Sequence, residues 1–239
     1  MHTRLFRYLN RNMAKSLGIF WIIIIISNIL ATVISYNIFP DVIFNSITIN
    51  NEIVTLSDPY SGTMTLVGNN LFTIPIFFIV YGIIGYYQYF PLTGAFGVTR
   101  KNFYIHTILN NLIIVGVSAL IQILLLKVDN IFMESLGYRP IVDFRLFNMN
   151  DNILLNIIIL AFVYLVFSSL LNLLGVLVYR FSYRAWIGLG IAGIISGLSL
   201  RGLGGFLATI AQAGFWAGLI VILLSYSLGF LIFRRVDIK

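Results

Sequence analysis

Residues 90 to 104 read Phe90-Pro-Leu-Thr-Gly-Ala-Phe-Gly-Val-Thr-Arg-Lys-Asn-Phe-Tyr104, a short basic stretch between two long uncharged runs. No charged side chain lies between residues 59 and 99, and none lies between residues 102 and 126. Arg100 and Lys101 are therefore the only charges near this point of the chain. Basic residues between apolar segments are typical of connections that stay on the cytoplasmic side of a membrane. The pattern predicts a cytoplasmic connector between two membrane spans.

The composition predicts the same class of protein. The chain has 239 residues, of which 59% are hydrophobic and 10% charged, and its mean hydropathy is +0.97. Average soluble domains have roughly 25% charged residues. Because only helices and closed barrels satisfy the backbone in lipid, and the long apolar runs do not alternate, we expect an all-α multi-pass membrane protein. The chain has no cysteine, which excludes disulfides, thiolate metal sites and cysteine nucleophiles.

The apolar runs predict six transmembrane helices within one membrane domain over residues 17–239. The expected spans are residues 17–39, 71–89, 105–126, 152–179, 186–200 and 214–233. Because the fifth run is short and the following uncharged run is too long for one span, residues 202–213 are expected to be re-entrant or interfacial. In the first polar loop, residues 46–55 are predicted to form a small β-hairpin.

Residues 1–16 carry basic side chains at helical spacing, with Leu5, Leu9 and Met13 on the other side. This pattern predicts an amphipathic helix on the cytoplasmic face, with its apolar side in the lipid and its cations toward anionic head groups. The alternative is a positive flank that only orients the first span. The membrane-surface residues expected here are Arg4, Arg7, Arg11 and Lys15.

The distribution of charge predicts that both termini are cytoplasmic. With that orientation, eleven of the 15 Lys and Arg residues fall on the cytoplasmic side, and seven of the eight acidic residues fall in the opposite loops. The net charge of +7 is then explained by the positive-inside rule and not by binding of nucleic acid.

The predicted spans contain no Asp, Glu, Lys or Arg in their interiors, so no proton relay is evident. No HExxH, GxSxG or GxxxxGK[ST] motif occurs, so an enzyme, a metal site and an autonomous ATPase are not expected, and neither is a cofactor. His106 is expected to be interfacial. The glycines between residues 188 and 197 are expected to allow close helix packing. The polar residues inside the spans are expected mostly to bond neighbouring helices, with a solute path as the alternative, and include Asn110, Asn111, Ser118, Gln122, Ser168, Ser169 and Asn172.

The connector and the overall pattern resemble permease subunits of the type-2 ABC exporter family, found in small bacterial transporters. The resemblance extends over the whole chain, through the basic N-terminal helix, the six spans and the terminal Arg234-Arg235-Val-Asp-Ile. Its most specific part is the segment Gly97-Val-Thr-Arg-Lys-Asn-Phe103. The resemblance implies a multi-pass protein of the bacterial plasma membrane whose connector is a coupling helix that docks on a separate ATP-binding subunit. It implies that this contact is made by Gly97, Thr99, Arg100, Lys101 and Phe103.

The absence of a charged relay and of a phosphate loop is consistent with this expectation. A transport protein that has neither of these features must receive its energy from a partner. Because such motors act in pairs, a second permease copy or a close paralogue is expected as well. Arg100 and Lys101 have a plainer interpretation as ordinary positive-inside charges. Two other functions stay open: a substrate-binding membrane subunit for vitamin or metal uptake, and a non-transporting immunity or sensor protein whose outer loops bind a peptide.

Overall fold

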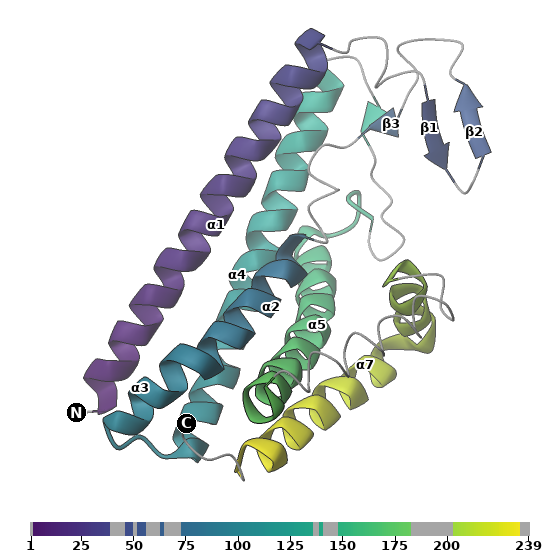
Figure 1. Cartoon of the computed structure of the whole chain (residues 1–239). Coiled ribbons are helices and arrows are strands. Elements are labelled where there is room, and N and C mark those ends of the chain that lie inside the picture. Colours follow the sequence, from purple (N-terminus) through teal and green to yellow (C-terminus); the bar gives the residue numbers. More distant parts are fainter. Residues whose placement is uncertain are drawn as a thin grey trace. The chain divides into compact units, whose positions relative to one another are not determined.

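The structure is a computed structural model, and it describes residues 2–38, 46–49, 52–55, 63–64, 73–135, 139–140, 148–182 and 203–234. Figure 1 shows the elements in chain order. The helices are α1 (His2–Ile38), α2 (Thr73–Ile84), the π-helix η2 (Gly85–Tyr89), α3 (Phe90–Ala95), α4 (Arg100–Ser135), α5 (Ile153–Phe181) and α7 (Leu203–Arg234). The strands are β1 (Ser46–Ile49), β2 (Glu52–Thr55), β3 (Thr63–Met64) and β4 (Arg139–Pro140).

Five helices in this part of the chain are long and apolar enough to cross a membrane. They cover Leu9–Leu30, Thr73–Ala95, Arg100–Ser135, Ile153–Phe181 and Gly214–Arg234. The prediction of a helical, multi-pass membrane architecture is therefore supported at this level. The predicted fifth span, residues 186–200, and the glycines within it lie outside the described residues.

The N-terminal basic segment differs from the prediction of a separate helix. Residues 2–16 are the first turns of α1, which continues without interruption to Ile38 (Figure 1). Phe6, Leu9 and Met13 are buried against protein, while Arg7 and Arg11 are exposed. Leu9 and Met13, which were expected to face lipid, therefore pack inside the chain.

The second and third spans are longer than predicted, and the connector between them is correspondingly shorter. The second span continues through η2 and α3 to Ala95, because Pro91 stands in the first turn of α3, where its missing amide hydrogen is not needed. Helix α4 begins at Arg100 and extends nine residues past the predicted end, Leu126. The fourth span, predicted at 152–179, agrees with α5 to within two residues.

Helix α7 changes direction at Gly214, whose φ of 79° and ψ of 178° are not helical. A positive φ is readily adopted only by glycine. The break falls where the sixth span was predicted to start, and residues 203–213 form the helical segment before it. Whether that segment is re-entrant stays a prediction.

The predicted hairpin is confirmed, since β1 and β2 pair antiparallel with Ile49 opposite Glu52. A second small sheet pairs β3 with β4 in parallel.

The chain forms two compact units. The first comprises Met1–Asn12, Ile74–Gly116 and Ala161–Lys239. Its core is an aromatic cluster contributed by α1, η2, α3, α4, α5 and α7, in which the Phe90 and Phe233 rings lie 4.6 Å apart and the Phe90 and Phe103 rings 5.3 Å apart. The cluster consists of Phe6, Leu9, Tyr86, Phe90, Val98, Phe103, Tyr104, Val176, Tyr179 and Phe233.

The second unit comprises Met13–Thr73 and Val117–Leu160. Within it, α1 buries Met13, Leu17, Trp21 and Ile24, which share one face at helical spacing. Helix α4 buries polar as well as apolar residues here, among them Asp129, which was predicted to lie in a loop beyond the third span.

Candidate functional site

The predicted connector is a tight turn between α3 and α4. The Gly97 amide donates to the Gly94 carbonyl at 2.9 Å and the Val98 amide to the Thr93 carbonyl at 3.0 Å. This is the Schellman arrangement that ends a helix, and it requires the positive φ of 74° found at Gly97. At the start of α4, the Thr99 hydroxyl accepts a hydrogen bond from the Asn102 amide at 3.3 Å, as an N-cap residue does.

The structure separates the five residues that were predicted to contact an ATP-binding subunit. Gly97, Thr99 and Lys101 are exposed at the turn. Arg100 is half-buried and donates from Nη1 to the Arg234 carbonyl at 2.9 Å. The Phe103 side chain is only 4% exposed, because it belongs to the aromatic cluster. Phe103 therefore packs inside this unit, and its contact with a partner stays a prediction.

A different aromatic residue is exposed at this turn. Phe96 is 45% exposed and Leu92, one helical turn before it, is 39% exposed. The polar side chains of Lys101 and Asn102 are exposed as well. The turn therefore exposes both apolar and polar side chains. Gly97 is a sequence signal that Phe96 lies at a helix end, but hydrophobicity alone does not show which of Phe96 and Phe103 faces inward.

Two arginines bind the last turn of α7. Arg100 reaches the Arg234 carbonyl, and Arg180 of α5 donates from Nη1 to the Ile232 carbonyl at 3.3 Å. The last four carbonyls of a helix have no partner within the helix, and cations near that end are favourable. The two guanidiniums therefore join the beginning of α4 and the end of α5 to the end of α7.

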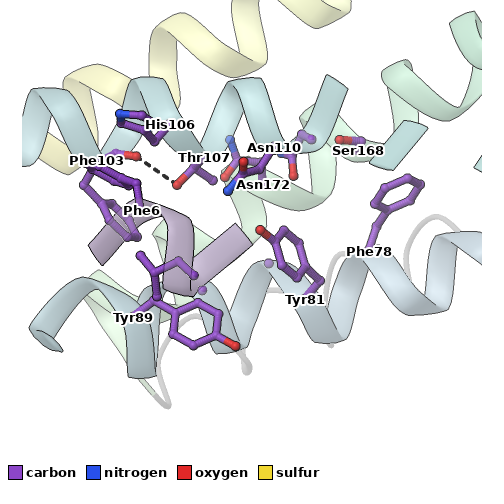
Figure 2. A pocket seen from close by; sticks show the side chains of 14 residues that line it. Phe6, Phe78, Tyr81, Tyr89, Phe103, His106, Thr107, Asn110, Ser168 and Asn172 are labelled. Carbon is purple, nitrogen blue, oxygen red and sulfur yellow. Dashed lines mark hydrogen bonds between the residues drawn. The ribbon is translucent and has the colours of Figure 1, made fainter. Parts of the chain in front are cut away.

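A polar cavity lies within the same unit. It has a volume of about 30 Å³, which is room for about two water molecules. Figure 2 shows carboxamides from α4 and α5 that point into it, with the Tyr81 hydroxyl directed toward them. Its polar lining consists of Tyr81, Tyr89, His106, Thr107, Asn110, Asn111, Ser168 and Asn172, and its other side of Phe6, Leu9, Phe78, Gly82, Gly85 and Phe103.

Asn172 is among the most deeply buried of these groups. It is 2% exposed, and its Oδ1 accepts a hydrogen bond from the Tyr86 hydroxyl at 2.6 Å. This bond joins η2 to α5 and confirms the predicted role of Asn172 in holding helices together. Its Nδ2 has no hydrogen-bond partner among the described residues.

His106 forms one rim of the cavity, where its ring stacks on that of Phe6 with 3.5 Å between centroids. This contact packs the N-terminal part of α1 against α4. The exposed Arg7 and Arg11 follow on the outer side of α1, as does Lys15, whereas the side chain of Arg4 lies outside the described part.

Compared with protein-family models, with curated proteins and with solved structures, the chain matches none of them.

Proposed function

We propose that the chain is the membrane permease subunit of an ATP-driven exporter of the bacterial plasma membrane. In this proposal a separate ATP-binding subunit docks at the α3–α4 turn, and a second permease copy or a paralogue completes the transporter. The observation that carries it is the turn itself. An exposed aromatic and an exposed lysine stand on a tight helical turn whose flanking helices are fixed in one buried aromatic cluster.

The membrane topology that this function needs is supported by the ends of the helices in the first unit. Phe6, Phe103, Tyr179 and Phe233 meet in one cluster, although they come from the first turns of α1 and α4 and the last turns of α5 and α7. If α5 and α7 both cross the membrane, these ends lie on one side of it. We therefore propose six spans, with both termini on the side of the turn.

The same cluster offers a route for mechanical coupling. Phe90 of α3 contacts Phe103 of α4, Tyr179 of α5 and Phe233 of α7 through ring pairs whose centroids are 4.6–5.6 Å apart. Closely packed interiors transmit displacement as rigid bodies. A push on the turn therefore moves the ends of α3, α4, α5 and α7 together, and neither a charged relay nor bound nucleotide is needed in this subunit.

The test is recovery of the ATP-binding subunit with a tagged chain from native membranes. Phe96→Ala removes the exposed aromatic, and truncation of an interface anchor costs about 2 kcal/mol or more. We expect at least a tenfold loss of the complex, with unchanged expression. The control is Phe132→Ala, which removes a side chain of nearly equal exposure, 42%, from the other end of α4. Equal recovery and ATP hydrolysis in wild type and Phe96→Ala would remove the turn from the interface.

The polar cavity does not favour the uptake alternative. Vitamin-sized ligands occupy pockets of about 300–1,000 Å³, whereas the polar cavity measures about 30 Å³. A vitamin that copurifies with the chain would reverse this preference.

A further inference from the structure

An open groove lies at the ends of α5 and α7, within the first unit. It has a volume of about 630 Å³, and the described residues that line it are Arg180, Leu231, Ile232 and Arg234. Both helices are long and apolar enough to cross a membrane, and they end at Phe181 and Arg234. The end of an apolar span is the level at which the hydrocarbon of a bilayer meets its head groups. The groove therefore lies within reach of lipid head groups.

The two arginines of the groove keep most of their hydrogen-bonding capacity for another partner. Nη1 of Arg180 donates to the Ile232 carbonyl at 3.3 Å, but a guanidinium has five N–H donors. The side chain of Arg234 is exposed, and it makes no hydrogen bond or ion pair with the residues that the structure describes. Guanidinium groups bind the oxygens of phosphates and carboxylates in pairs. The groove therefore favours an anionic ligand that offers several oxygens.

The first unit offers no described acid to these cations. Its described residues include neither Asp nor Glu, and Asp237, the one acid in its sequence, lies outside them. Two like charges that line one groove repel each other, so an anion bound between them removes an unfavourable interaction. Arginine is well suited to phosphate in particular, because its planar group matches the geometry of the phosphate oxygens.

An apolar stripe on α7 leads to the groove. Leu224, Leu228 and Leu231 are 47–58% exposed, and their spacing of four and three residues places them on one face of the helix. Arg234 follows Leu231 by three residues and continues this face. A row of exposed leucines that ends in a cation matches the acyl chain and the phosphate of a phospholipid. Free phosphate would use the cations alone.

We propose that the groove binds an anionic phospholipid, with Arg180 and Arg234 on its phosphate oxygens and one acyl chain along the leucine stripe of α7. Basic pockets between membrane helices bind anionic lipid head groups in this way. A zwitterionic lipid has the same phosphate, but its ammonium group adds a cation to a groove that is already cationic. The site rests on α5 and α7 as membrane helices and not on the export proposal.

The experiment is native mass spectrometry of the full chain, purified in detergent and mixed with equal amounts of phosphatidylglycerol and phosphatidylcholine of identical acyl chains. We expect the wild type to retain at least fivefold more phosphatidylglycerol. Arg234→Gln should lower this ratio at least threefold, because charge-assisted hydrogen bonds to the phosphate are lost. Lys101→Gln is the matched control, since it removes another exposed cation of the same unit, and it should leave the ratio unchanged.

A second pair of variants tests the apolar part of the site without a change of charge. Leu231→Gln should lower the retention of phosphatidylglycerol at least twofold, because the side chain both lines the groove and belongs to the stripe. Leu109→Gln, at a position 49% exposed on α4, should retain as much as the wild type. Glycerol 3-phosphate, which has the phosphate without the acyl chains, should not displace the lipid at equal concentration.

Three results would overturn the proposal. Equal retention of the two lipids by the wild type would show that the groove does not select an anionic head group. Equal ratios in Arg234→Gln and Lys101→Gln would indicate a general effect of charge, and displacement by glycerol 3-phosphate would indicate a site for free phosphate. None of these results bears on recovery of the ATP-binding subunit with Phe96→Ala.

Discussion

At the scale of single residues, glycines set how closely helices approach in the first unit. A Cβ on Gly175 of α5 would lie 2.9 Å from the Gly82 carbonyl oxygen and 3.0 Å from a Tyr86 ring carbon. The nearest atom is backbone, so the helices themselves would have to move. The crossing of α2 and α5 therefore depends on the absence of a side chain, as is common between membrane helices.

Gly175→Ala should lower the free energy of unfolding by about 1–3 kcal/mol, the usual cost of overpacking. The measurement is the loss of helical circular dichroism in a denaturing detergent titration. Gly116→Ala is the matched control, because its Cβ would meet nothing within 4 Å and the change should be neutral or slightly stabilising. Equal midpoints for both variants would mean that the Gly82–Gly175 contact does not limit packing.

Phe103→Ala should be a stability variant. Its ring is buried between those of Tyr86, Phe90 and Phe233, with centroid distances of 5.3–5.9 Å. Truncating a buried phenylalanine costs about 3–5 kcal/mol. Thermal unfolding in detergent should occur well below the wild-type temperature, whereas Phe96→Ala should unfold with the wild type. A wild-type melting curve for Phe103→Ala would contradict the cluster.

Phe96 and Phe103 also show what the sequence does not predict at the scale of single residues. Hydrophobicity identifies the connector but not which aromatic faces inward, because that depends on where α3 ends and α4 begins. Likewise Asn110, Asn111, Ser168 and Asn172 are recognisable as polar residues of spans. Their convergence on one cavity depends on helix rotation, which is fixed by glycine contacts such as Gly82 with Gly175.

At the scale of elements, the end of α7 is held by two guanidiniums from other helices. Arg180 also lies over the Phe181 ring, with Cζ 5.2 Å from its centroid, which limits the freedom of its side chain. Each cation at a helix C-terminus contributes about 0.3–1 kcal/mol. Arg100 and Arg180 are thus structural ties as well as positive-inside charges.

The variant Arg100→Gln with Arg180→Gln should loosen the last turn of α7. Amide hydrogen exchange at residues 229–234 should become about threefold to tenfold faster, because two such contacts are lost. Lys101→Gln removes an exposed charge beside Arg100 and should leave the exchange unchanged. Identical exchange in the double variant and the wild type would show that the two contacts do not hold the helix end.

The sequence predicts the existence of these elements better than their ends. The apolar runs predict the bounds of α5 and the start of the last span closely, because polar residues and Gly214 interrupt those runs. Helix α4 exceeds its prediction because Lys127 and Asp129 resemble loop residues, yet the helix continues through them and buries Asp129. The π-helix η2 has no signal in hydropathy.

At the scale of the whole molecule, the distribution of charge and the aromatic cluster both support the proposed topology. The basic residues indicate which side is cytoplasmic. The cluster gathers the starts of α1 and α4 with the ends of α5 and α7, which requires an even number of crossings if each span is complete. Neither argument uses the other, and in the proposed topology the α3–α4 turn is on the side where α1 begins and α7 ends.

Single cysteines in the naturally cysteine-free chain test this topology directly. An impermeant maleimide added to intact cells should label Asn150→Cys and Phe215→Cys, and should label Asn102→Cys only after permeabilisation. Asn102 and Asn150 are exposed outside the predicted spans, and Phe215, 57% exposed, follows the break at Gly214. Phe215 decides between five spans and six, because it lies outside only if residues 182–213 return across the membrane. Labelling of Asn102→Cys in intact cells would reverse the orientation and remove the turn from the reach of any cytoplasmic ATP-binding subunit.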